Sequence, residues 1–144
     1  MIRLKSKKDI SGIRDAGAIL AETLDKIKKE LQAGMKTSDI DDIAREYIIS
    51  RKARPACLGY MGYPASICVS VNEEVIHGIP GKRVIREGDI VSCDLCVDLK
   101  GYIADSTVTI PVGKISPQAE KLLKVTEESL YLGIEKAVAG NRVM

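Results

Sequence analysis

The first thirty residues carry apolar side chains at three- and four-residue steps, a spacing that places them on one face of a helix. These positions are Ile10, Ile13, Ala16, Leu20, Leu24, Ile27 and Leu31. Ser6 and Asp9 have the spacing of a capping box, with Asp in place of the usual Glu. We therefore predict a helix from Ser6 to about Leu31, and Gly34 supplies its stop signal.

Two further helices are predicted on either side of the central part of the chain. The first runs from residue 37 or 38 to about Arg51, because Asp39, Asp41 and Asp42 suit a helix N-terminus. The second begins at Ser116 and Pro117, a capping residue followed by proline at the first helical position. It is expected to reach about Ala139, with Gly140 as its cap. The positions predicted to face inward are Leu122, Val125, Leu130, Ile134 and Val138.

Between Pro55 and Val112 the pattern changes to short runs rich in Val, Ile and Tyr, separated by turn residues. Strands are predicted at residues 66–71, 75–77, 90–97 and 102–111. Asp98 and Gly101 occupy the first and fourth positions of the last turn, as a type I turn favours. Helices that flank an antiparallel meander indicate the α+β class.

Composition narrows the class of protein further. The chain has 144 residues, 45% of them hydrophobic and 29% charged, which is the balance of a globular domain and not of a disordered chain. No stretch has the ~18 uninterrupted apolar residues of a membrane span. The net charge of +2 comes without Trp or Phe, so a nucleic-acid surface is not predicted. The charged N-terminus lacks a secretory signal, so we expect the cytoplasm, where the four cysteines stay reduced.

Cys93 and Cys96 form a C-x-x-C pair, which in other contexts marks zinc or redox chemistry. Both lie in a predicted strand, where a spacing of three places side chains on opposite faces. They cannot bind one ion there without breaking the strand, and the chain has no second pair of this kind. We therefore interpret both as small apolar filling residues.

The last hairpin contains the sharpest chemical signal. If residues 98–101 are the turn, Asp94 faces Asp105 directly, and a bulge at Gly101 would make them diagonal neighbours. Like charges at opposed positions are destabilising, so the pair requires a reason. A divalent cation is one, a proton shared between the carboxylates is another, and a slipped register with both groups in water is the third. The single histidine, His77, precedes a Gly-Pro loop, where functional groups are often displayed.

The run from Ala56 to Pro80, which contains CLGYMGYPASICVSVNEEVIHGIP, resembles type I methionine aminopeptidases of the bacterial kind. So does the run from Gly88 to Gly113, with its spacing of eleven between Asp94 and Asp105. The resemblance extends from the first helix to Val143. It implies the pita-bread (creatinase/aminopeptidase) fold, in which two α+β halves enclose a dinuclear metal site, and it implies removal of the initiator methionine from new polypeptides.

The resemblance also implies roles for individual residues. Asp94 would bind one metal ion and Asp105 would bridge two, with cobalt, manganese, iron or zinc as candidate ions. His77 would contact substrate and stabilise the tetrahedral intermediate as a catalytic group. The methionine side chain would bind in a pocket formed by Cys57, Tyr60, Tyr63 and Cys68, and His77 would be a further substrate-binding residue. Nascent N-termini would be the substrates and the ribosome a further partner.

The chain departs from the family pattern in one respect. The family's remaining metal ligands, a histidine and two glutamates, lie in its second half, and this chain keeps two ligands of five. We therefore expect residues 1–144 to be a partial catalytic domain that is inactive alone and self-associates, whereas the complete enzyme would be a monomer. The alternatives are a non-catalytic half-fold that binds partners and a metal-free two-carboxylate hydrolase such as a glycosidase.

Overall fold

The computed structural model describes residues 4–142. Two helices open the chain, α1 (Lys7–Glu30) and α2 (Thr37–Ser50), as the apolar periodicity predicts. The predicted capping box at the start of α1 is confirmed. The Asp9 N–H donates to Ser6 Oγ at 3.2 Å, and the Ser6 N–H donates to Asp9 Oδ2 at 2.9 Å. These bonds satisfy N–H groups that the helix itself leaves without acceptors.

The four strands form one antiparallel sheet around its central strand, β3 (Ile90–Leu99). Strand β4 (Tyr102–Pro111) pairs with β3 along its whole length. The other edge of β3 is shared by the short strands β1 (Arg54–Pro55) and β2 (Cys68–Val71). Since every pair is antiparallel, the predicted α+β class is confirmed.

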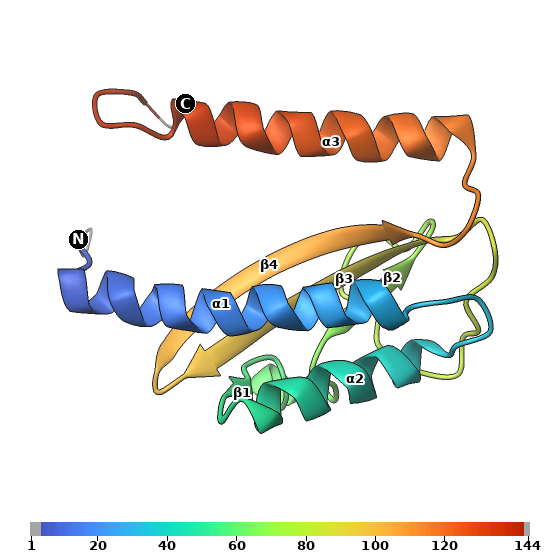
Figure 1. Cartoon of the computed structure of the whole chain (residues 1–144), viewed down its shortest axis with the longest axis horizontal. Coiled ribbons are helices and arrows are strands. Elements are labelled where there is room, and N and C mark those ends of the chain that lie inside the picture. The colour runs from blue at the N-terminus through green and yellow to red at the C-terminus, as the bar shows by residue number, and fades with distance from the viewer. Residues whose placement is uncertain (1–3, 143–144) are drawn as a thin grey trace.

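The two faces of the sheet differ in character because side chains alternate along β3. Val91, Cys93, Leu95 and Val97 are fully buried in one core cluster with residues of α1 and α2. Their neighbours Ser92, Asp94, Cys96 and Asp98 point to the opposite, open face. Figure 1 shows both helices on one side of the sheet. The aliphatic core on that side leaves the polar face free to carry chemistry.

The predicted strand at residues 75–77 is wrong. The chain instead forms an exposed loop, in which Val75 is 93% and Ile76 62% exposed. Asn72 and His77 both have a positive φ, of 56° and 60°, which a continuous strand cannot contain. The Val71 N–H is satisfied by Glu74 Oε2 at 2.8 Å, so a side chain takes the place of the expected partner strand.

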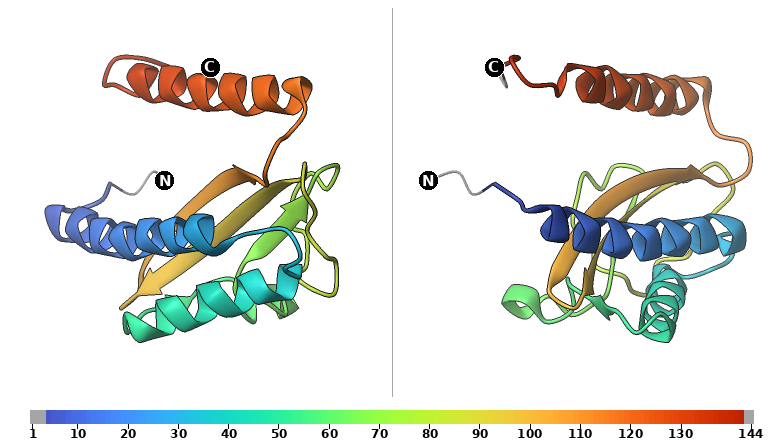
Figure 2. Two further views of the ribbon diagram at one scale, coloured as in Figure 1. Left: turned by 45° about the vertical axis from the view of Figure 1, so that its right-hand side comes forward. Right: turned by 60° about the vertical axis from the view of Figure 1, so that its left-hand side comes forward.

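The third helix, α3 (Pro117–Lys136), begins as predicted, with Ser116 Oγ accepting from the Ala119 N–H at 3.2 Å. Its end and its burial differ from the prediction. The helix stops at Lys136, before Gly140, and none of its residues is buried. The side chains predicted to face inward are therefore exposed. Figure 2 shows the cause in both views, because α3 stands apart from the sheet and no described element packs on it.

Within residues 4–142, no helix combines the length and the apolar character that crossing a membrane requires.

Candidate functional site

The β3–β4 hairpin places its two aspartates in a register that differs from the predicted one. Leu99 pairs with Tyr102, so the loop contains only Lys100 and Gly101, with φ of 56° and 86°. Two successive positive φ values are typical of a type I′ turn, whose twist matches that of the strands. The expected type I turn and the direct opposition of Asp94 and Asp105 are therefore wrong.

The observed register makes the two aspartates diagonal neighbours on the open face. Asp94 pairs with Thr107, and Asp105 pairs with Cys96, two residues along β3. Thr107 Oγ1 donates to Asp94 Oδ1 at 2.8 Å and so fixes one side of the half-buried carboxylate. Asp105 is exposed. Diagonal neighbours lie about 7–8 Å apart, a separation at which a cation between two carboxylates offsets their repulsion.

A largely apolar pocket adjoins the carboxylates on the same side of the sheet. The structure brings together all five residues predicted to contact substrate, and the full lining is Cys57, Tyr60, Met61, Gly62, Tyr63, Pro64, Cys68, His77 and Ile79. Cys68 connects the two parts of the site, because it pairs with Asp94 in the sheet and also lines the pocket.

The Tyr63 hydroxyl holds two walls of the pocket together. It lies 3.2 Å from the carbonyl oxygen of Ile67 and 3.2 Å from that of Gly78, and its single proton is shared between these two acceptors. Burial raises the pKa of Tyr63 above its usual range, and a hydrogen bond with the Cys68 thiol acts in the same direction. Burial also raises the pKa of Cys68, although the bond to Tyr63 partly opposes this. Both groups are therefore neutral at pH 7.

His77 lies at the edge of the pocket, and hydrogen bonds of the next residue hold the backbone there in place. The next residue, Gly78, donates its N–H to Ser70 Oγ at 3.1 Å, and its carbonyl accepts from the Val69 N–H at 2.9 Å. A Cβ at position 78 would lie 2.3 Å from the Val69 carbonyl oxygen, so only glycine permits this approach. The exposed imidazole of His77 is thus held in place through its neighbour.

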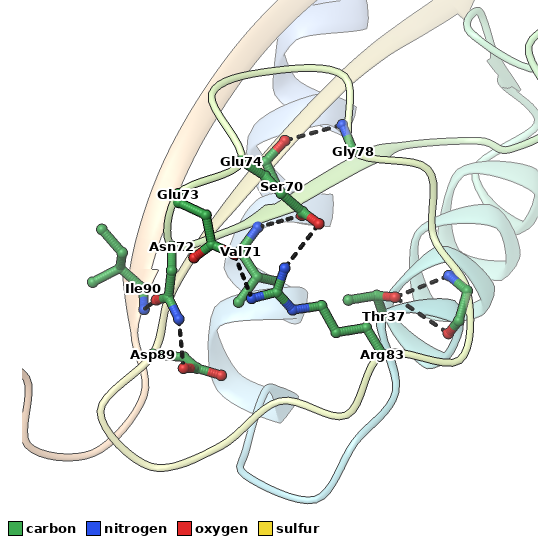
Figure 3. A network of polar contacts seen from close by, with 11 residues as sticks. Thr37, Ser70, Val71, Asn72, Glu73, Glu74, Gly78, Arg83, Asp89 and Ile90 are labelled. Carbon is green, nitrogen blue, oxygen red and sulfur yellow. Dashed lines mark hydrogen bonds and ion pairs between the residues drawn. The ribbon is translucent and has the colours of Figure 1, made fainter.

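The far end of the His77 loop is held by a polar network, drawn in Figure 3. Asn72 donates to Asp89 Oδ1 at 2.8 Å and accepts from the Ile90 N–H at 3.0 Å, which ties the loop to the start of β3. Arg83 pairs with Glu74 at 2.8 Å. Burial raises the pKa of Asp89, but hydrogen bonds from Asn72 and the Arg86 N–H outweigh it, and the pKa is lowered overall.

Sequence reasoning missed several residues of the site. Met61 and Ile79 line the pocket, Thr107 orients Asp94, and Cys96 lies beside Asp105. Strand alternation could have identified Thr107, because it lies two residues beyond Asp105 on the same face. The opposite orientation of Cys93 and Cys96 is confirmed, but only Cys93 fills the core. Cys96 contacts the carboxylate site instead.

The donor set fits a divalent cation only in part. Carboxylate oxygens are suitable ligands for manganese, iron, cobalt or zinc as well as for harder ions. Among the described residues, however, no group of three or more His, Cys, Asp and Glu side chains is arranged to hold an ion. Asp94 and Asp105 can therefore supply part of a metal site, and they require further ligands to complete it.

Comparison with known proteins assigns the fold and the family. A methionine aminopeptidase of Clostridium acetobutylicum is 49% identical over 99% of this chain, and methionine aminopeptidase 1 of Bacillus subtilis is 48% identical. The chain spans 58% of the length of each of these curated relatives. The solved methionine aminopeptidase of Rickettsia prowazekii superposes with a TM-score of 0.91 at 37% identity, covering 93% of this chain and 54% of that one.

A more distant structure agrees on the architecture. The prolidase of Pyrococcus horikoshii superposes with a TM-score of 0.79 at 21% identity, over 37% of its own length, which is a likeness of fold alone. The expected half of the pita-bread fold is thus confirmed. The model of metallopeptidase family M24 matches residues 11–144. The chain therefore belongs to metallopeptidase family M24.

Proposed function

We propose that the chain forms part of the centre of a methionine aminopeptidase, which removes the initiator methionine from polypeptide N-termini. One observation carries the proposal: Cys68 lines an apolar pocket and is paired with Asp94, so the pocket ends beside the two carboxylates. A substrate whose side chain fills the pocket would have its backbone at Asp94 and Asp105. This is the arrangement that cleavage next to a recognised side chain requires.

The pocket suits a methionine side chain. Tyr60, Tyr63 and the thiols of Cys57 and Cys68 offer ring faces and polarisable sulfur, with which a thioether makes favourable contacts. His77 is exposed at the edge of the pocket and can reach the substrate carbonyl as a hydrogen-bond donor. These residues bind and orient the substrate in the proposal.

Asp94 and Asp105 would hold the divalent ions, with Asp105 shared between two of them. The metal, when bound, supplies a nucleophilic water and polarises the scissile carbonyl. Thr107 keeps the Asp94 carboxylate in one orientation, as partners of metal ligands commonly do. The other ligands must come from residues beyond those described, so we expect residues 1–144 to act as a partial catalytic domain.

The compartment and partners follow from this function. Newly made chains are the substrates with an initiator methionine, so we propose action in the cytoplasm at or near the ribosome. The four cysteines, all free in the structure, suit a reducing compartment.

A chimera tests the proposal. Residues 1–142 are joined to the part of the Bacillus subtilis relative that this chain does not cover, and release of methionine from a Met-Gly-Met peptide is measured with added Mn²⁺ or Co²⁺. We expect metal-dependent cleavage by the chimera and none by either part alone. Asp94→Ala or Asp105→Ala should reduce the chimera's turnover by more than about 100-fold, the upper end of what losing a group that only supports a ligand costs.

Asp98→Asn is the matched control, because Asp98 lies on the same face of β3 but its carboxylate accepts from the Gly101 N–H in the hairpin turn. It should leave turnover within about two-fold, because Asp98 neither lines the pocket nor pairs with Asp105. A well-folded chimera that releases no methionine, or one that is equally active without Asp94, would contradict the proposed function.

A further inference from the structure

Three of the four cysteines gather around the open face of the sheet, beside the carboxylates. Cys57 lines the pocket, Cys68 pairs with Asp94, and Cys96 pairs with Asp105. The fourth, Cys93, is fully buried in the core on the other face. Cys96 is neither a ligand of the proposed metal site nor a residue of the pocket lining, so neither role explains its position beside Asp105.

Strand pairing brings Cys57 and Cys96 together. Strand β1 ends with Pro55 opposite Val97, and the next residue, Ala56, donates its N–H to the Cys96 carbonyl oxygen at 2.8 Å. Cys57 is therefore one step past the residue bonded to Cys96. From the spacing between paired strands and the rise per residue, the Cα atoms of Cys57 and Cys96 lie on the order of 6 Å apart. This is within the range that a disulfide spans. Burial raises the pKa of the Cys96 thiol, and Asp105 and the Cys57 thiol act in the same direction, so Cys57 lies among the groups near Cys96.

The surroundings favour this pair over the other combinations. Both Cys57 and Cys96 are half-buried, and Cys57 is reached from the open pocket. Cys68 is buried, and the pocket wall beside it is held in place by the Tyr63 hydroxyl, which bonds to two backbone carbonyls. Cys93 points to the opposite face and is closed to solvent. An oxidant that enters the pocket thus meets Cys57 first and finds Cys96 as its neighbour.

We propose that Cys57 and Cys96 form a reversible disulfide when a hydroperoxide reaches the pocket. The Cys57 sulfur attacks the terminal peroxide oxygen, the O–O bond breaks, and an alcohol leaves, which gives a sulfenic acid. The Cys96 sulfur then attacks Cys57 Sγ, the S–O bond breaks, and water leaves with the remaining proton. The two thiols lose two electrons and the hydroperoxide gains them. A dithiol reductant reverses the reaction by thiol–disulfide exchange.

The disulfide would change the pocket while leaving the core intact. In the reduced chain, backbone pairing attaches the start of segment 56–63 to β3, through the Ala56 N–H and the Cys96 carbonyl oxygen. The new bond ties it to β3 through a side chain as well, and it removes the Cys57 thiol from the pocket and the Cys96 thiol from beside Asp105. The modification depends on neither metal nor substrate, so it stands apart from the proposed function.

The test uses the whole 144-residue chain, reduced and then treated with tert-butyl hydroperoxide. The chain is then unfolded in denaturant, and the remaining thiols are blocked with N-ethylmaleimide before mass spectrometry without reduction. We expect a loss of two hydrogens, blocking of Cys68 and Cys93 only, and recovery of four thiols after dithiothreitol. Cleavage at Met61 separates Cys57 from Cys68, and cleavage before Asp94 separates Cys93 from Cys96, so the linked pair is identified directly.

Variants complete the test. Cys57→Ser and Cys96→Ser should each abolish the intramolecular bond, whereas Cys68→Ser and Cys93→Ser should leave it in place. Before oxidation, N-ethylmaleimide should modify Cys57 at least ten times faster than Cys93. A bond that includes Cys68 or Cys93, oxidation that stops at a sulfenic acid on Cys57, or equal reactivity of Cys57 and Cys93 would each overturn the proposal.

Discussion

The Asp94 and Asp105 side chains repel each other across the sheet unless something positive lies between them. The chain alone should therefore bind Mn²⁺ or Co²⁺ weakly, because it offers two carboxylates and no completed ligand set. Asp94→Ala and Asp105→Ala should each abolish this binding in isothermal titration calorimetry. Asp98→Asn should bind as the unchanged chain does. Equal affinity in all four chains would show that the ion binds elsewhere.

Tyr63 supports the pocket through its hydroxyl more than through its ring. Tyr63→Phe removes the one hydroxyl proton shared by the carbonyls of Ile67 and Gly78 and should lower the free energy of unfolding by about 1 kcal/mol. Urea denaturation followed by circular dichroism measures the change. Tyr60→Phe is the control, because Tyr60 is exposed and its hydroxyl makes no side-chain hydrogen bond among the described residues. A stability loss as large in Tyr60→Phe as in Tyr63→Phe would contradict this role.

At the residue scale, the sequence predicted which groups meet but not their relative positions. The five pocket residues were identified by resemblance, and the structure gathers them. The offset of Asp94 from Asp105 was missed because it depends on the turn type. A loop of Lys100 and Gly101 moves the register by two residues and keeps the face unchanged. Cys96 was missed because its chemistry comes from its cross-strand neighbour, which periodicity does not reveal.

At the scale of elements, Gly12 allows helix α1 to pack closely on the Tyr102 ring of strand β4. A Cβ at position 12 would lie 2.3 Å from the Tyr102 ring, whereas a Cβ at Gly133 in α3 would meet no atom within 4 Å. Gly12→Ala should therefore lower the free energy of unfolding by about 1–3 kcal/mol through overpacking. Gly133→Ala should increase helical circular dichroism without destabilising the chain. If Gly12→Ala matched Gly133→Ala in a thermal melt, α1 would not pack on Tyr102 as described.

Asp98, whose carboxylate is bonded to the hairpin turn, should make the free energy of unfolding depend on pH in the acid range. The bond to Arg54, together with that from the Gly101 N–H, lowers the pKa of Asp98 below its usual value of 3.8. A lowered pKa in the folded state contributes stability that is complete above the unfolded pKa. This stability is lost as the pH falls through the folded value. Unfolding free energy should thus decline below about pH 4, and Asp98→Asn should show a shallower decline in urea titrations between pH 5 and 2. Identical slopes would contradict this contribution.

Helices whose bounds are set by their own side chains were predicted correctly. Features that depend on neighbouring elements, such as a strand at residues 75–77 and the burial of α3, were not. Helices α1 and α2 end within about a residue of their predicted bounds because caps and periodicity act locally. The segment 75–77 has strand-forming residues, yet Glu74 closes its turn before any ladder forms. The apolar stripe of α3 predicted the helix correctly but not its burial, since burial requires a neighbour.

At the scale of the whole molecule, the described residues separate into a packed body and one projecting helix. Every buried apolar residue described lies in the sheet, in α1 or α2, or in a loop that adjoins them, and α3 contributes none. Figures 1 and 2 show α3 reaching the body only through the segment after β4. The body's stability should therefore be independent of α3, whereas the solubility of the chain should depend on it.

The exposed apolar side chains of α3 should cause the chain to self-associate. Leu122, Leu130 and Ile134 are 58%, 61% and 56% exposed and share one side of the helix. Exposed stripes of this kind gain free energy when a second copy covers them. The molar mass from light scattering should rise with protein concentration.

Replacing these three residues with Ser should restore a monomer while leaving the midpoint of urea unfolding of the sheet unchanged. A control that replaces Lys121, Lys124 and Glu128 on the polar side should still associate. A chain that stays monomeric at every concentration would show that α3 is covered by its own body in solution.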